Sequence, residues 1–267
     1  MPTGSLLKTG ASLFCFRNEV VMKKLAVVLL LCGCLKAPEV PPSLVGEAKR
    51  ALAEREKRLT SFKLVVDSTE GPNRALQARH EVAFRSPNKS RAHVTSPTDL
   101  VITFDGVTLM RLFPAEKKYE VVRLDMPPAE RAFLLASTFR PFVPEGYRAP
   151  LLPQVGVEAR KVSRENATDA VELTVKPGDG VTVHYVLRMP AGDFLEKRTE
   201  AEGEERILWV EREKCDEALR LCVPTRLVEK IGELVIGTTE VTSFELNAAL
   251  PQDYFAPPRT PEGWTAR

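Results

Sequence analysis

The side chains that most often carry out chemistry, histidine and cysteine, are few in this sequence of 267 residues. Three histidines occur, His80, His93 and His184, and each falls within a segment that alternates like a β-strand. Their spacing does not match a metal site, and no Gly-x-Ser-x-Gly nucleophile motif is present. The phosphate-binding patterns of P-loop and dinucleotide-binding enzymes are also missing. We therefore expect no catalytic residue, no metal and no cofactor, and we do not expect an enzyme.

Cys215 and Cys222 form the one close pair of cysteines outside the first 34 residues. In an oxidising compartment such as the periplasm, a pair of this kind is normally a disulfide. A zinc site would need further cysteine or histidine ligands nearby, and the sequence offers none. On the chain-entropy model, closing so small a loop contributes about 2–3 kcal/mol. We expect a structural disulfide.

Cys34 ends an apolar run and begins a proline-rich segment. The run "LAVVLLLC" (25–32) follows Lys23 and Lys24. It is much shorter than the roughly 20 apolar residues of a membrane-spanning helix, but it suits a signal peptide. The tetrapeptide "LCGC" (31–34) resembles the lipobox of bacterial lipoproteins, Leu-x-Gly-Cys. The resemblance implies that the thiol of Cys34 accepts a diacylglyceryl group. The alternative is an ordinary cleaved signal with a chance cysteine.

The chain is expected to have three parts: a signal peptide (1–33) whose true start is Met22, a lipidated tether (34–42) and one domain (43–267). Removing residues 1–33 takes away four of the 38 Lys and Arg residues and one of the 36 Asp and Glu residues, which leaves a net charge of −1. Such a chain lacks the basic surface that nucleic acids require. Leu35 follows the anchor cysteine, where Asp would retain an enterobacterial lipoprotein in the inner membrane. We expect the outer membrane, with the protein facing the periplasm.

Hydrophobic periodicity predicts a leading helix followed by many short strands. Ser43 should cap a helix that runs to about Leu59, and a second helix is expected over 127–139. Asp105-Gly106 predicts a tight hairpin. Strands are expected at 61–68, 75–84, 90–94, within 99–113, and at 117–124, 155–163, 170–176, 181–188, 194–201, 205–212, 221–230 and 233–246. This pattern predicts a mainly β fold with covering helices, built as one curved antiparallel sheet or an open barrel.

The segments "FRSPNKSRAHV" and "FDGVTLMRLFPAEKKYEVV" are similar to the lipoprotein carrier family of LolA and LolB. Matching positions are Arg85, Pro87, Arg91, Asp105, Gly106 and Pro114, and near the end of the chain Asn247, Pro251 and Phe255. The similarity covers about residues 43–263. Ser86 and Ala92 depart from the family pattern. The resemblance implies a half-open antiparallel β-barrel whose mouth is covered by the two helices, with Arg85, Arg91, Phe133 and Phe139 as lid contacts.

The same resemblance implies an apolar interior that accepts acyl chains. A 16-carbon chain in water costs on the order of 12 kcal/mol, at about 0.8 kcal/mol per CH₂, so a lipid in transit must be shielded. The residues expected to line the cavity are Phe62, Leu64, Val66, Phe84, Val94, Leu109 and Phe113. The alternative for this set is a filled core beneath the helices.

We therefore expect a protein that binds acyl chains of lipoproteins or lipids, palmitate among them, and aids their transport or insertion at the outer membrane. A periplasmic carrier protein is a further expected partner. Two alternatives remain open at this point. One is an envelope lipid sensor like the RseB family, and the other is a structural envelope lipoprotein that binds no lipid.

Overall fold

The computed structural model describes residues 43–71, 76–164 and 167–267, which form the domain discussed below. The predicted signal peptide, the tether and Cys34 lie outside the described residues. Among the residues that are described, no helix is both long enough and apolar enough to cross a membrane.

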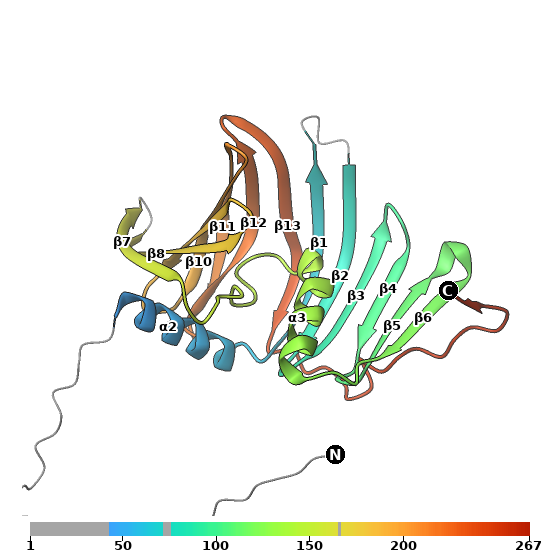
Figure 1. Cartoon of the computed structure of the whole chain (residues 1–267). Helices are drawn as coiled ribbons and strands as arrows, with labels where there is room; N and C mark the ends of the chain where they lie inside the picture. The colour runs from blue at the N-terminus through green and yellow to red at the C-terminus, as the bar shows by residue number, and fades with distance from the viewer. Residues whose placement is uncertain (1–42, 72–75, 165–166) are drawn as a thin grey trace, which may run out of the picture. The chain divides into compact units, whose positions relative to one another are not determined.

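The domain is built on one sheet of 14 strands (Figure 1). The strands are β1 (Ser61–Glu70), β2 (Leu76–Arg85), β3 (Lys89–Ser96), β4 (Leu100–Phe104), β5 (Thr108–Phe113), β6 (Lys118–Arg123), β7 (Val157–Arg164), β8 (Ala167–Gly178), β9 (Val181–Arg188), β10 (Asp193–Ala201), β11 (Glu204–Asp216), β12 (Leu221–Ile231), β13 (Leu234–Leu246) and β14 (Thr265–Ala266). Two α-helices, α2 (Leu44–Arg58) and α3 (Pro128–Phe139), and two 3-10 turns, η1 (Pro114–Glu116) and η2 (Arg140–Phe142), complete the fold.

The order of the strands explains why the sheet remains open. It runs β14-β6-β5-β4-β3-β2-β1-β13-β12-β11-β10-β9-β8-β7, so one meander extends from β1 to β6 and a second returns from β7 to β13. The second meander closes onto the first where β13 pairs antiparallel with β1. Within the described strands, β7 and β14 stand at opposite ends of the order and do not pair. The result is the half-open antiparallel barrel that the sequence predicted.

The predicted helix cap at Ser43 and the predicted hairpin turn at Asp105 are both present. The Ser43 hydroxyl accepts a hydrogen bond from the Gly46 N–H (3.2 Å) and caps α2. Asp105 turns the β4–β5 hairpin, because its carboxylate accepts hydrogen bonds from the N–H groups of Val107 (2.9 Å) and Thr108 (2.8 Å). β14 and the two 3-10 turns were not predicted.

The apolar residues form two main groups, one under each helix. The "α3 core" consists of Leu59, Phe62, Leu64, Val66, Val82, Phe84, Ala92, Ile102, Phe104, Leu109, Leu124, Leu135, Phe139, Tyr147, Leu221, Val223 and Val241. The "α2 core" consists of Ala48, Leu52, Val171, Leu173, Val175, Tyr185, Leu187, Phe194 and Leu227. Each helix therefore covers its own half of the sheet, as Figure 1 shows for α3 in front of β1 and β2 and for α2 beside β8 and β10.

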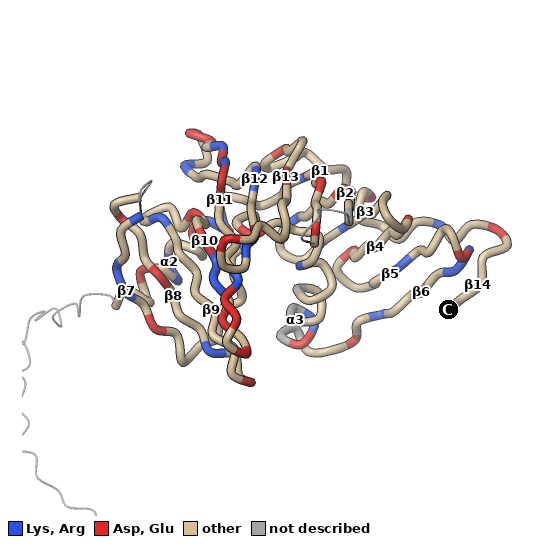
Figure 2. The backbone as a smooth tube through the Cα atoms, turned by 90° about the horizontal axis from the view of Figure 1, so that it is seen from above, with Lys and Arg blue, Asp and Glu red and all other residues tan. Residues whose placement is uncertain are grey.

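Charged residues lie mainly outside these cores. Figure 2 shows Lys and Arg positions mixed with Asp and Glu positions along β10 and β11. One carboxylate in this region, Glu172 on β8, is only 1% exposed, and Arg160 and Arg198 pair with it. The mixing of signs agrees with a salt-bridged surface and not with a patch of one charge.

Candidate ligand-binding site

A cavity of about 220 Å³ lies where the C-terminal half of α3 meets β2 and β3. Its apolar wall includes Phe84, Leu135, Phe139, Val143, Pro144 and Leu151. Phe84, Leu135 and Phe139 also belong to the α3 core, so the cavity continues directly onto the packed interior. Its volume is below the roughly 300–1,000 Å³ of typical small-molecule pockets, which means that it holds only part of a long chain.

Most of the residues predicted to line an acyl cavity form closely packed core instead of an open wall. Phe62 and Leu64 are 0% exposed, Val66 is 1%, Leu109 3% and Phe84 4% exposed. Ring contacts fill the space between them: the Phe62 centroid lies 5.5 Å from that of Phe84 and 5.7 Å from that of Tyr147. Of the seven predicted residues, Phe84 is the one that borders the cavity.

The other two predicted lining residues lie farther out on the sheet. Val94 on β3 is partly buried and pairs with His80 on β2 and Leu100 on β4. Phe113, the last residue of β5, is also partly buried, and the Arg267 guanidinium lies 4.5 Å from the centre of its ring. Neither residue borders the cavity beside α3.

The four residues expected at the lid have different positions. Phe139 lies in α3, borders the cavity and is 5% exposed. The side chain of Phe133, also in α3, lies outside the described part of the structure. Arg85 donates hydrogen bonds to the carbonyl oxygens of Leu250 (3.0 Å), Pro251 (3.3 Å) and Gln252 (3.4 Å), and Arg91 donates to that of Tyr254 (3.3 Å).

The two arginines therefore hold the C-terminal segment and not α3. The reason is strand alternation: Phe84 points into the α3 core, so Arg85, its neighbour in β2, points to the opposite face. There the Arg85 guanidinium lies 5.1 Å from the centre of the Phe255 ring, which is completely buried. Arg85 thus contacts Phe255, and Arg91 contacts the neighbouring Tyr254, on the face of the sheet opposite the α3 core.

The rim of the cavity is charged. Arg148 ion-pairs with Glu56 of α2 (3.1 Å) and lies with its guanidinium carbon 3.7 Å from the centre of the Phe84 ring. Glu56 also accepts a hydrogen bond from the Ala149 N–H (2.6 Å). On the other side, Arg140 pairs with Glu145 (3.3 Å). The cavity is therefore lined by two cations, Arg140 and Arg148, and by one carboxylate, Glu145. Glu56 is not a lining residue but pairs with Arg148.

A second cavity of about 460 Å³ lies between the N-terminal half of α2 and β8. Its walls carry the charged residues Glu47, Arg50, Glu54, Lys161 and Asp169. Because so many charges line it, this cavity suits an apolar ligand less well than the one beside α3.

Comparison with known proteins gives a clear result for the fold only. No protein-family model and no curated protein matches the sequence. Among solved structures, a putative outer membrane lipoprotein-sorting protein domain from Vibrio parahaemolyticus aligns over 78% of this chain and 97% of its own, with a TM-score of 0.51 and 11% identity. The chain has a LolA-like fold. At this level of identity the similarity shows architecture and not activity.

Two further solved structures align with lower TM-scores. The LolA superfamily protein NE2245 from Nitrosomonas europaea covers 79% of this chain, with 97% of its own length aligned, 15% identity and a TM-score of 0.48. MucB covers 80% of this chain with 64% of its own length aligned, at 14% identity and a TM-score of 0.36.

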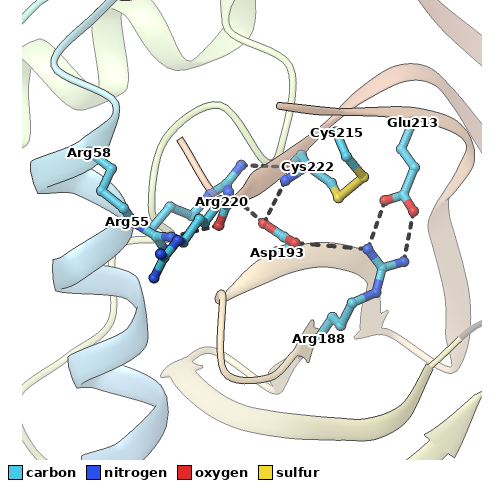
Figure 3. The surroundings of a disulfide bond; sticks show 8 residues. All are labelled: Arg55, Arg58, Arg188, Asp193, Glu213, Cys215, Arg220 and Cys222. Atoms are coloured by element: carbon cyan, nitrogen blue, oxygen red, sulfur yellow. Dashed lines mark hydrogen bonds and ion pairs between the residues drawn. A yellow bond between two sulfur atoms is a disulfide. The ribbon is translucent and has the colours of Figure 1, made fainter. Parts of the chain in front are cut away.

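In this LolA-like fold, the loop that follows α3 is held by a buried arginine (Figure 3). Arg55 of α2 pairs with Asp193 of β10 (2.6 Å), and both side chains are 3% exposed. Arg55 also donates to the carbonyl oxygens of Gly146 (2.6 Å) and Cys222 (2.9 Å). Burial lowers the pKa of Arg55 and raises that of Asp193, while their mutual attraction opposes both shifts.

The predicted disulfide between Cys215 and Cys222 is present beside this cluster (Figure 3). It joins residues that face each other across β11 and β12. The Cys222 N–H donates to the Asp193 carboxylate (3.0 Å). Two residues farther along β12, the Pro224 carbonyl accepts a hydrogen bond from the Tyr147 hydroxyl (2.9 Å). The loop after α3 is therefore bonded to the end of the β11–β12 hairpin that carries the disulfide, through Tyr147 directly and through Arg55, which binds both Gly146 and Cys222.

The three histidines make local contacts. His80 is 7% exposed, and its Nε2 lies 2.8 Å from the Phe142 carbonyl in η2, the turn that follows α3. Burial lowers the pKa of His80. The other two lie against carboxylates, since His93 contacts Asp99 (3.0 Å) and His184 lies 3.4 Å from Glu172.

Sequence reasoning missed Arg55, Glu56 and Arg148, yet one of them left a signal. Arg55 falls on the apolar stripe of α2, in line with the buried Ala51 and Leu52. A charged residue in such a stripe predicts a buried partner, because an unpaired charge is too costly to bury. Glu56 and Arg148 had no comparable signal, since Glu56 lies among the many charges of α2 and Arg148 lies in a proline-rich loop without regular periodicity.

Proposed function

We propose that this chain is a periplasm-facing bacterial lipoprotein that binds acyl chains of lipoproteins or lipids beneath α3 and aids their transport or insertion at the outer membrane. Cys34 would carry the lipid anchor, and a periplasmic carrier protein would exchange cargo with it. The observation that carries the proposal is the continuity between the cavity and the α3 core at Phe84, Leu135 and Phe139. The LolA-like fold, which it shares with a putative lipoprotein-sorting domain, agrees with this function.

A long chain fits only if α3 moves, and the energies allow such a movement. Leu135 and Phe139, which belong to the α3 core among the α3 side chains that the structure describes, together contribute about 3–6 kcal/mol by burial. A 16-carbon chain gains on the order of 12 kcal/mol when it leaves water, at about 0.8 kcal/mol per CH₂. Ligand binding would therefore outweigh the displacement of these two side chains, and the chain would take their place against Phe84.

The test is to purify the protein without detergent and to identify extracted lipids by mass spectrometry. Acyl transfer from labelled donor vesicles to acceptor vesicles is then measured for the Ser90→Trp variant, because Ser90 borders the cavity and an indole would fill it. Thr95→Trp is the matched control, since Thr95 is an exposed residue of the same strand. Loss of acyl transfer in Ser90→Trp but not in Thr95→Trp supports the proposal. If a folded Ser90→Trp variant transfers acyl chains as well as the unmodified protein does, the proposal is contradicted.

The filled α3 core favours one alternative, a structural envelope lipoprotein that binds no lipid. Phe62, Leu64 and Val66 already occupy the space beneath α3 and are at most 1% exposed. On this alternative the extract contains no lipid, and labelled acyl chains do not bind at any concentration below their solubility limit. The same two measurements therefore separate the candidates.

A further inference from the structure

The cavity beside α3 has an apolar floor and a charged rim, and the two meet at one residue. The guanidinium carbon of Arg148 lies 3.7 Å from the centre of the Phe84 ring, which forms part of the floor. Its side chain is 38% exposed, so the charge stands at the boundary between the cavity and solvent. An amphiphile whose tail lies on Phe84 would bring its head group to this position.

The present partner of Arg148 is within reach of solvent. The Arg148 Nε donates to both oxygens of Glu56 (3.2 and 3.1 Å), its Nη2 lies 3.1 Å from Oε2, and the Glu56 side chain is 30% exposed. Water and salt screen an ion pair with this degree of exposure, so an anion that makes the same two contacts can compete for Arg148. Glu56 keeps a strong donor after separation, since the Ala149 N–H lies 2.6 Å from its Oε1. A ligand anion can therefore replace Glu56 at Arg148 without leaving that carboxylate unsatisfied.

The second arginine of the rim is similarly placed. Arg140 is 43% exposed and lies 3.3 Å from Glu145. Glu145 has a closer partner in Lys197, at 2.8 Å. The lining residues Arg140, Glu145 and Arg148 carry a net charge of +1, and Lys197 compensates the single carboxylate among them. The electrostatic balance at the mouth thus favours a negative ligand group.

We propose that this cavity selects amphiphiles with an anionic head group, phosphate or carboxylate, and that Arg148 and Arg140 bind that head. The inference rests on the proposed acyl-chain function and adds the class of ligand. Guanidinium groups suit this role because their planar N–H donors match the oxygens of phosphate and carboxylate. Arg148 would act as a specificity-determining residue, and Glu56 as the group that the ligand displaces.

The experiment compares ligands that share one tail and differ in the head. Dodecyl phosphate, dodecanoate, dodecanol and dodecyltrimethylammonium are titrated into the protein by calorimetry. The charged ligands are kept below their critical micelle concentrations, and dodecanol is kept below its solubility limit. The anionic ligands should bind at least about tenfold more tightly than dodecanol, because a hydrogen bond between charged groups contributes enough binding free energy for that ratio of affinities. The ammonium ligand should bind most weakly. A stronger response to dodecyl phosphate points to a phospholipid-type head, and a stronger response to dodecanoate points to a fatty acid.

Variants then assign the preference to the rim. Arg148→Gln should remove the advantage of the anions over dodecanol, because the cavity then loses one of its two guanidinium groups. Glu56→Gln should raise anion affinity by about fivefold, because it frees Arg148 while its amide oxygen still accepts the Ala149 N–H. Arg123→Gln is the matched control, since Arg123 is 72% exposed and pairs with Asp125. Thermal unfolding of each variant checks that it is folded.

The outcomes separate this inference from the function on which it rests. If none of the four ligands binds, the proposed function fails and the inference fails with it. If all four bind equally, or if Arg148→Gln keeps the wild-type advantage of the anions and Glu56→Gln leaves anion affinity unchanged, acyl binding stands and the anion preference is overturned. Should Arg148→Gln be unfolded, Glu56→Gln alone decides, because its expected effect is a gain.

Discussion

The buried Arg55–Asp193 pair should be the most sensitive electrostatic contact in the domain. Asp193→Ala removes the carboxylate and leaves the Arg55 guanidinium, 3% exposed, with only two carbonyl partners. It also leaves the Cys222 N–H without its acceptor. Breaking a buried pair on one side costs about 3–5 kcal/mol. For a domain of this size, each kcal/mol lowers Tm by about 2–4 °C, so the expected decrease is roughly 6–20 °C.

Thermal unfolding followed by circular dichroism measures this effect, with Asp125→Ala as the matched control. Asp125 also pairs with an arginine, Arg123, but both side chains are 72% exposed. Asp125→Ala should therefore change the free energy of unfolding by no more than about 0.5 kcal/mol. The double variant Arg55→Met/Asp193→Leu should lose less stability than the sum of its single variants, because no charge remains buried. Equal decreases in Tm for Asp193→Ala and Asp125→Ala would refute this reasoning.

Three further outcomes are expected. Burial lowers the pKa of His80 below the ordinary value of 6.5, so the folded protein favours the neutral imidazole. The contribution of His80 to stability is therefore complete above pH 6.5 and is lost as the pH falls below it. The decrease in Tm from pH 7 to pH 5 should be smaller in His80→Gln than in the unmodified protein. Gly146→Ala should lower the free energy of unfolding by about 1–3 kcal/mol more than Gly156→Ala in urea titrations, because both glycines have positive φ but only a Cβ at Gly146 meets a proline ring, at 2.8 Å. Phe255→Ala should cost about 3–5 kcal/mol and increase proteolysis of the C-terminal segment, whereas truncation of the 82% exposed Val155 should change neither.

The sequence singled out Asn247 in the C-terminal part of the chain, but it did not show which residues Asn247 contacts. Asn247 was recognised as a family position, and it accepts the Thr60 N–H (2.8 Å) and donates to the Arg58 carbonyl (2.8 Å). It therefore joins the end of α2 and the start of β1 to the end of β13. These partners lie far away in the sequence, so no pattern near Asn247 could identify them.

What the sequence determined by itself was the identity of the elements. The alternation of apolar residues predicted the strands from β1 to β13, the apolar stripe and Ser43 predicted α2, and Asp105-Gly106 predicted a hairpin turn. The pair Cys215 and Cys222 predicted the disulfide. These signals are readable because strand alternation, helix capping and turn formation depend on neighbours only a few residues apart.

Which elements meet, and how much space remains between them, depends on contacts between residues far apart in the sequence. Arg55 finds Asp193 across 138 residues, and Arg148 closes on Glu56 across 92. Alternation places Phe62 and Phe84 on one face of the sheet, but it does not show whether that face is empty or filled. That outcome depends on the volumes of side chains that converge from distant segments, and here Phe62, Leu64 and Val66 fill the space beneath α3.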